Sequence, residues 1–246
     1  MDTETLKTAL EHRAHKGGVR RMNFVYPIRD EKHLFALLHF LKDWNRNYYI
    51  AAAIGINWGL RCSDILALTL EDVIAGSGAR IQIRTEIRLV EIKNHHERII
   101  PISDNMRTVL REHISWLGYP AIPIESPLIM SRNFKYAEDG TAQLKPLSRK
   151  RLWTAISFAA QELGFADNLG THSLRKTYVW QAWKRGESLD IIRKELGHSS
   201  VEYTERYAAI PLSFSRGVYE KVNFSLPPTP KTKRGKRSNG TQSKRR

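Results

Sequence analysis

Hydrophobic residues recur with helical spacing along much of this chain. After Pro27, four leucines follow the i, i+3, i+4, i+7 pattern of a helix that buries one face. These are Leu34, Leu37, Leu38 and Leu41. Asp30 precedes them where an N-cap belongs, because its side chain can accept a hydrogen bond from a free backbone N–H. The pattern therefore predicts a helix that begins near Asp30.

Further helices are predicted by the same criteria. Ser63 and Ser103 stand in N-cap positions, and Gly118 ends the segment that Ser103 opens. Ser199 and Glu202 have the spacing of a capping box. The expected helices cover about 47–60, 64–70, 103–117, 148–163, 172–185, 188–196 and 200–208.

One region has the pattern of strands. Residues 80–84, 87–92 and 98–102 form short, isoleucine-containing and partly alternating runs, and residues 93–97 make a turn between the last two. Residues 119–147 are rich in Pro and Ser, which indicates a loop. The expected fold is mainly α with a small three-stranded antiparallel sheet (α+β).

The chain is strongly basic. It has 40 Lys and Arg against 25 Asp and Glu, a net charge of +15, which favours nucleic acid or an anionic membrane as partner. Residues 226–246 hold eight basic residues and no acidic one, about half of that charge. Because this segment is rich in Pro, Gly and Ser, we expect a disordered tail that seeks polyanions. A tail that only adds solubility is the alternative interpretation.

Several classes of protein are not expected. Cys62 is the one cysteine, so there is no internal disulfide framework and no multi-cysteine zinc site. No carboxylate cluster or Cys/His spacing suits a metal ion, and we expect neither metal nor cofactor. The first residues lack the apolar core of a signal peptide, and the apolar stretch 48–60 is too short to span a bilayer. A cytoplasmic protein with no membrane partner is expected.

Six residues at separate places suit the chemistry of a phosphodiester. They are Arg61, Lys93, His172, Arg175, His198 and Tyr207. Two guanidiniums can hold the non-bridging oxygens, imidazoles can donate hydrogen bonds or move protons, and a lysine can protonate a departing alkoxide. A tyrosine oxygen can attack phosphorus. The unperturbed pKa of tyrosine is about 10, so cationic neighbours are needed to lower the cost of losing the phenol proton. The arginine pair would supply them.

The motifs that carry these residues resemble the catalytic domain of tyrosine recombinases, the phage integrase family. They are GLRCSDILALTLEDV (59–73), the Lys93 hairpin ending in RIIPI, THSLRKT (171–177) and LGHSSVEYTERY (196–207). The order of the motifs and the distances from Arg175 to His198 and from His198 to Tyr207 fit the family pattern. The resemblance covers roughly residues 29–220 and implies the fold of that catalytic domain.

The resemblance implies a role for each matching residue. Arg61 and Arg175 would bind the scissile phosphate and stabilise its pentavalent transition state. Lys93 would protonate the departing 5′-hydroxyl, and His172 occupies the base position of the HxxR motif. Asp64 falls where the family carries an acidic residue that supports the first arginine.

The remaining roles concern the nucleophile. His198 matches the second histidine, which hydrogen-bonds the phosphate, and Tyr207 matches the tyrosine that becomes bonded to the 3′-phosphate. Tyr203 lies four residues earlier on the same helix face, and it is expected to be a packing residue because only Tyr207 has the family spacing from His198. The implied activity is site-specific recombination or integration of DNA through a covalent 3′-phosphotyrosyl link, without a cofactor.

The resemblance also implies a domain organisation and partners. Residues 1–28 would be a short N-terminal extension, 29–222 the catalytic domain and 223–246 the basic tail. The family usually carries an N-terminal core-binding domain before the catalytic domain, whereas only residues 1–28 precede it here. We therefore expect that domain to be absent or supplied by another chain, such as an accessory DNA-binding protein. The expected assembly is a homotetramer on two duplexes of double-stranded DNA, located at the nucleoid. Residues expected to contact DNA are Lys176, Lys231, Lys233, Arg234, Lys236 and Arg237.

Two other functions stay open at this point. A type IB topoisomerase uses a similar set of residues to relax supercoils. A non-catalytic relative that lacks the core-binding domain would bind DNA through its basic surface and form no covalent link.

Overall fold

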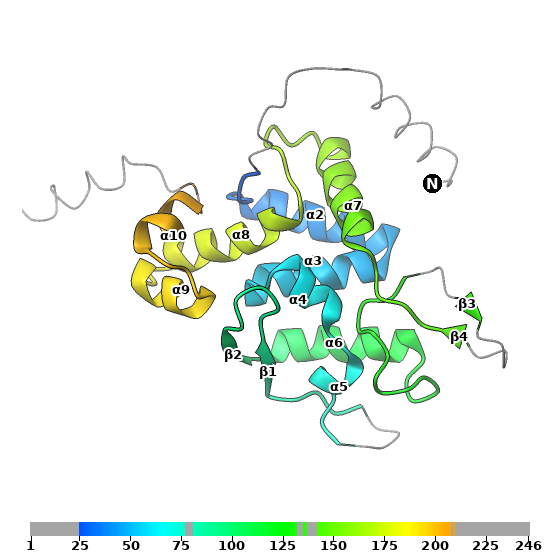
Figure 1. The fold of residues 1–246 in the computed structure, drawn as a ribbon. Coiled ribbons are helices and arrows are strands. Elements are labelled where there is room, and N and C mark those ends of the chain that lie inside the picture. The colour runs from blue at the N-terminus through cyan, green and yellow to red at the C-terminus, as the bar shows by residue number, and fades with distance from the viewer. Residues whose placement is uncertain (1–24, 77–80, 132–134, 137–141, 208, 210–246) are drawn as a thin grey trace, which may run out of the picture. The chain divides into compact units, whose positions relative to one another are not determined.

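The computed structural model describes residues 25–76, 81–131, 135–136, 142–207 and 209 (Figure 1). All of them belong to one compact unit, Met1–Ile210. The helices are α2 (Glu31–Trp44), α3 (Arg46–Trp58), α4 (Cys62–Ala67), α5 (Leu70–Val73), α6 (Asp104–Leu117), α7 (Arg149–Glu162), α8 (Thr171–Lys184), α9 (Leu189–Leu196) and α10 (Val201–Tyr207). The strands are β1 (Glu86–Val90), β2 (Glu97–Pro101), β3 (Lys135–Tyr136) and β4 (Ala142–Gln143). This mainly α architecture with a small antiparallel sheet confirms the predicted fold class.

Local capping explains several of the helix boundaries. The Asp30 side chain accepts a hydrogen bond from the N–H of Lys32 at the start of α2. The Ser103 hydroxyl accepts one from Met106 at the start of α6, and Gly118 ends that helix with a φ of 93°. Because a left-handed residue after the last turn is most easily a glycine, α6 stops where the sequence predicts.

Two predicted caps are wrong. Helix α4 begins at Cys62, one residue before the predicted cap Ser63, with Arg61 as an N-cap that makes no side-chain bond. At α10 the hydroxyl that accepts from the N–H of Tyr203 belongs to Ser200, and the predicted Ser199 is one residue too early. Adjacent serines compete for the same role, so the sequence alone does not choose between them.

Helix α3 forms the centre of the hydrophobic core. It is buried on nearly all sides and packs against α2 and α8 (Figure 1). A Cβ at Gly55 would lie 2.8 Å from Cβ of Leu174, so the glycine allows α3 and α8 to approach closely. Since Leu174 precedes Arg175, this packing fixes the part of α8 that carries Arg175.

The sheet has fewer strands than predicted. Strands β1 and β2 pair antiparallel with Ile87 opposite Ile100, and both isoleucines are buried. The predicted strand 80–84 does not join them; within its described part, Ile83 forms an isolated bridge with Ile74. Thr85 and Glu86 follow it, and neither residue favours a two-residue hairpin turn, so the chain runs on into β1. The predicted loop 119–147 also contains the short antiparallel pair β3–β4, which was not predicted.

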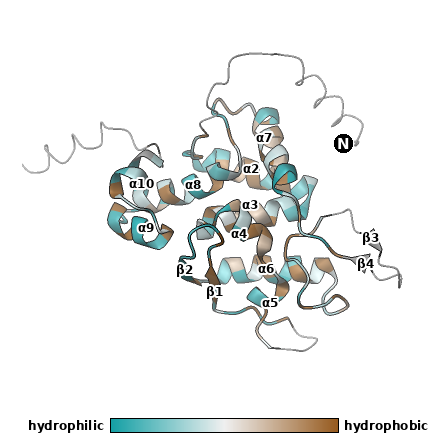
Figure 2. Ribbon diagram, viewed as in Figure 1, coloured by the Kyte–Doolittle hydropathy of each residue, from teal (hydrophilic) through white to brown (hydrophobic). Residues whose placement is uncertain are grey.

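A second, smaller hydrophobic cluster joins the last three helices. Buried Val179, Ile192 and Leu196 pack with Tyr207 among the partly buried side chains around them. Ile192 and Leu196 are four residues apart on α9, and Figure 2 shows both hydrophobic and hydrophilic residues on that helix. This packing holds the end of α10 against α8 and α9.

None of the described helices is both long and apolar enough to cross a bilayer. The predicted N-terminal extension is described only from Val25 onward, and the predicted basic tail lies outside the described residues.

Candidate active site

One cavity of about 500 Å³ gathers all six residues that the sequence singled out for phosphodiester chemistry. They come from the start of α4, the β1–β2 turn, α8, the α9–α10 connection and the end of α10. The residues are Arg61, Lys93, His172, Arg175, His198 and Tyr207. A larger cavity of about 1260 Å³ beside α7 shares His172 and Arg149 with this one.

Arg175 is the anchor of the site. The side chain is almost fully buried, with Arg175 2% exposed, and its guanidinium joins α8 to three other segments of the chain. Nη1 donates to the carbonyl of Gly59 and to Oε1 of Glu91, each at 2.8 Å, and Nη2 donates to the carbonyl of Leu196 at 2.8 Å. Since buried polar groups need partners, these bonds hold the end of α3, the hairpin and α9 around α8.

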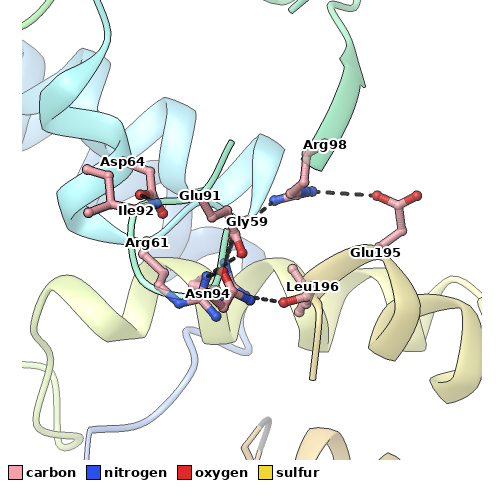
Figure 3. A network of polar contacts seen from close by, with 10 residues as sticks. Gly59, Arg61, Asp64, Glu91, Ile92, Asn94, Arg98, Glu195 and Leu196 are labelled. Atoms are coloured by element: carbon pink, nitrogen blue, oxygen red, sulfur yellow. Dashed lines mark hydrogen bonds and ion pairs between the residues drawn. The ribbon is translucent and has the colours of Figure 1, made fainter. Parts of the chain in front are cut away.

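Arg61 contacts the other oxygen of the same carboxylate. Its Nη1 donates to Oε2 of Glu91 and, at 3.2 Å, to Oδ1 of Asn94. The network in Figure 3 places Glu91 among these residues, with Arg98 on its other side. Burial disfavours ionisation of Glu91, but Arg175 and Arg61 outweigh it and lower the pKa of that carboxyl. Glu91 is the main residue of the site that sequence reasoning missed.

Two contacts dock the hairpin onto the rest of the site. Oδ1 of the buried Asp64 accepts a hydrogen bond from the N–H of Ile92 at 2.9 Å. Gly197 has a φ of 60°, and a Cβ there would lie 2.9 Å from the side-chain nitrogen of Asn94. The described bond of Asp64 therefore goes to the Lys93 hairpin, and the carboxylate that contacts Arg61 is Glu91.

The two histidines are biased toward the neutral form. Burial, with Arg175 and Arg61 adding to it, lowers the pKa of His198 to about 4. Its Nδ1 lies 3.0 Å from the hydroxyl of Thr204, which orients the ring. Desolvation and then nearby cations, chiefly Arg149, lower the pKa of His172. A neutral imidazole has one N–H donor and one acceptor nitrogen, which suits either a hydrogen bond to phosphate or acceptance of a proton.

Tyr207 is enclosed by aromatic and cationic groups. Its ring centroid lies 5.1 Å from that of His198 and 5.9 Å from that of Tyr203, and Nζ of Lys176 lies 5.2 Å from it. Burial raises the pKa of Tyr207 to about 12, and Arg175 offsets that only in part. Arg175 and Arg61 thus act on the phenol in the predicted direction, but their effect is smaller than that of burial.

The predicted DNA contact at Lys176 presupposes an exposed side chain, and the structure buries it. Lys176 is 5% exposed, Nζ donates to the carbonyl of Val25 at 2.8 Å, and burial lowers the pKa of the amine to about 8. Arg149, at the start of α7, lines the cavity and was missed by sequence reasoning. The other predicted DNA contacts, Lys231, Lys233, Arg234, Lys236 and Arg237, lie outside the described residues.

Comparisons with known proteins agree on one family. Residues 29–211 match the sequence model of the phage integrase family. The probable integrase/recombinase YoeC of Bacillus subtilis is 28% identical over 81% of this chain and 97% of its own length. The tyrosine recombinase XerC of Bradyrhizobium diazoefficiens is 29% identical over 62% of this chain, which spans only 42% of that relative.

Solved structures show the same fold. The structure of XerA recombinase has a TM-score of 0.60 at 16% identity and covers 85% of this chain and 68% of its own. The structure of XerH site-specific recombinase bound to its palindromic difH substrate has a TM-score of 0.55 at 18% identity, with coverage of 79% and 52%. The architecture is thus that of tyrosine recombinase catalytic domains.

Proposed function

Because this chain belongs to the phage integrase family, we propose that it cuts and rejoins DNA strands as a site-specific recombinase or integrase. The named relatives and solved structures are integrases and recombinases, which favours strand exchange over supercoil relaxation. The observation that carries the proposal is the meeting of two arginines, two histidines, a lysine and a tyrosine in one cavity.

The proposed reaction is a phosphoryl transfer to Tyr207. The phenol oxygen attacks the scissile phosphorus, an O–P bond forms, and the bond from phosphorus to the 5′-oxygen breaks. The tyrosine proton passes to a base, for which His172 is the candidate, and Lys93 gives a proton to the departing 5′-oxygen. A 5′-hydroxyl from another strand then reverses the reaction, so energy is conserved in the phosphotyrosyl ester.

The two arginines supply the electrostatic part of the mechanism. Arg61 and Arg175 present N–H groups to the cavity, where they can bind the non-bridging oxygens of the phosphate. Burial raises the pKa of Tyr207 to about 12, so the phenol is protonated at neutral pH. We therefore propose that attack becomes efficient only when a phosphate in the cavity orients the phenol and its proton acceptor.

The proposed partner is double-stranded DNA. The XerH structure contains a palindromic DNA substrate, which supports a duplex in the same position here. A homotetramer on two duplexes, a DNA-binding accessory protein and a nucleoid location belong to the same proposal. Contacts from the basic tail would make DNA binding weaken steeply with salt.

The experiment begins with selection of bound sites from a random duplex library. A bound site is then rebuilt with a nick shortly to the 3′ side of the cleaved phosphate, so that the short fragment bearing the free 5′-hydroxyl diffuses away and the covalent product is trapped. Wild-type protein should give an adduct that survives denaturation, and Tyr207→Phe should give none. Tyr203→Phe, on the same helix, is the matched control and should still give adduct.

The same experiment separates the alternatives. No adduct from the wild type on any bound site would refute the proposal and favour a non-catalytic DNA-binding relative. An adduct accompanied by relaxation of a supercoiled plasmid, without joined products, would favour the topoisomerase alternative.

A further inference from the structure

A buried carboxylate joins the two arginines of the candidate active site. Glu91 follows β1 directly and is 0% exposed. Its Oε1 accepts from Arg175 and its Oε2 accepts from Arg61, whose positions in the sequence are 84 and 30 residues away. The two oxygens of one side chain therefore set the distance between two guanidiniums that come from different segments.

The bonds to Glu91 leave donors for a substrate. Each guanidinium has five N–H groups. The described bonds of Arg175 use three of them and those of Arg61 use two. Glu91 thus fixes one part of each guanidinium, and among the described residues two N–H groups of Arg175 and three of Arg61 have no acceptor, so they can bind phosphate oxygens.

Charge also explains why a carboxylate belongs here. Two guanidiniums this close repel each other, and removal from water makes the repulsion stronger. Nη1 of the buried Arg98 adds a third cation 4.0 Å from Oε1 of Glu91, and its Nη2 lies 3.6 Å from the carboxylate of Glu195 on α9. Glu91 and Glu195 together compensate two of the three positive charges, so the cluster keeps a positive charge that attracts a phosphodiester anion.

We infer that Glu91 is a positioning residue that holds Arg61 and Arg175 at the spacing needed to bind the scissile phosphate before DNA arrives. The inference rests on the proposed function, since it concerns the same phosphate. The lowered pKa of Glu91 agrees with an ionised carboxylate at neutral pH. Arg98, which contacts Glu91 in Figure 3 and is not among the residues that line the cavity, would help to hold the carboxylate in place.

The test is Glu91→Gln. The amide has nearly the shape of the carboxylate, but its nitrogen donates and cannot accept a hydrogen bond. The side chain can therefore accept from one arginine through its oxygen, and the bridge between the two arginines is lost. The variant loses one negative charge, so its net charge is more positive by one. Because DNA is an anion, we expect it to bind the variant as tightly as the wild type or more tightly. The rate constant of single-turnover cleavage should fall about 10- to 100-fold, as expected for a displacement of about 1 Å in a reacting group.

The matched control is Glu97→Gln. Glu97 is an exposed carboxylate on the same hairpin, and its substitution changes the net charge by the same amount. It should leave cleavage within about twofold of the wild type, as expected for an exposed site away from the reacting groups. If the role of Glu91 were purely electrostatic, Glu91→Gln would change DNA binding, and it would cleave DNA at nearly the same rate as Glu97→Gln.

The outcomes are distinct. Tight binding with slow cleavage in Glu91→Gln alone supports the inference, and equal cleavage rates in the two glutamine variants would overturn it. If Glu91→Gln does not fold, Glu91→Asp is the second variant. It retains the charge but is one methylene too short to bridge both arginines. Slow cleavage by a folded Glu91→Asp supports the inference, whereas full cleavage or failure to fold would overturn it.

The wild type distinguishes failure of the proposed function from failure of this inference. Wild-type protein without adduct would overturn both. Wild-type adduct together with fast cleavage by Glu91→Gln would overturn the inference alone.

Discussion

Replacement of Arg175 by lysine removes a guanidinium on which four chain segments converge. The side chain is almost fully buried, and its three described hydrogen bonds go to Gly59, Glu91 and Leu196, each at 2.8 Å. Lysine keeps the positive charge but offers one compact ammonium in place of the planar fork. Arg175→Lys can therefore keep the ion pair with Glu91 only at the expense of at least one carbonyl.

The magnitude follows from the bonds that are lost. A buried acceptor left without a partner costs about 1–3 kcal/mol. With one or two such carbonyls, we expect Arg175→Lys to lower the free energy of unfolding by about 2–4 kcal/mol. A domain of this kind is stable by about 5–15 kcal/mol, so the variant should still fold.

Urea unfolding followed by tryptophan fluorescence measures this loss, because Trp58 and Trp180 are buried. The midpoint should fall with an unchanged slope. Arg185→Lys is the control: Arg185 directly follows α8, and its Nη1 donates only to Gln181 in the described structure, so its effect should stay within about 0.5 kcal/mol. Equal stability of the two lysine variants would refute the role of Arg175 as the structural anchor of the site.

Three further predictions concern other described residues. Gly59→Ala should lower the free energy of unfolding in urea by about 2–4 kcal/mol, because a Cβ at φ +62° is strained and would lie 2.5 Å from the ring of Tyr178; an unchanged midpoint would contradict the close packing. Burial lowers the pKa of His113 to about 4, so the unfolded chain takes up the proton first as the pH falls below about 6.5, and stability falls between pH 6.5 and 4. Urea titrations over this range should show a dependence that is shallower in His113→Gln by about 1.4 kcal/mol per pH unit, and parallel curves would contradict the pKa. Lys176→Met should change DNA affinity less than about twofold while it slows cleavage, since Nζ faces the Tyr207 ring rather than solvent; a loss of affinity with normal cleavage would instead support a phosphate contact.

The fold was largely predictable because its signals are local. The leucine spacing after Asp30 and the cap at Ser103 act within one or two helical turns, so α2 and α6 begin and end near the predicted residues. The third strand was not predictable in this way, because strand pairing depends on a partner elsewhere. The run that includes Ile83 pairs at one bridge with Ile74 instead of turning back onto β1.

The same distinction applies to the site. The motifs around Arg61 and His198 carry residues that line one cavity, and their order in the sequence sufficed to select them. Glu91 has no local signal beyond an acidic residue after an apolar strand, and its importance appears only when folding brings two distant arginines to it. Lys176 follows Arg175, but one residue along a helix rotates a side chain by about 100°, which sends the amine toward Val25 and Tyr207.

The identity of the tyrosine that carries the DNA tests the account most directly. The covalent adduct is trimmed with nuclease, unfolded and digested with trypsin, which cuts after Arg206 and separates Tyr203 in peptide 195–206 from Tyr207 in peptide 207–216. Fragmentation in the mass spectrometer then locates the added nucleotide. It also does so when trypsin fails to cut after Arg206, in which case both tyrosines lie in peptide 195–216. The account predicts a nucleotide bonded through phosphate to Tyr207, and a nucleotide on Tyr203 or on any other residue would contradict it.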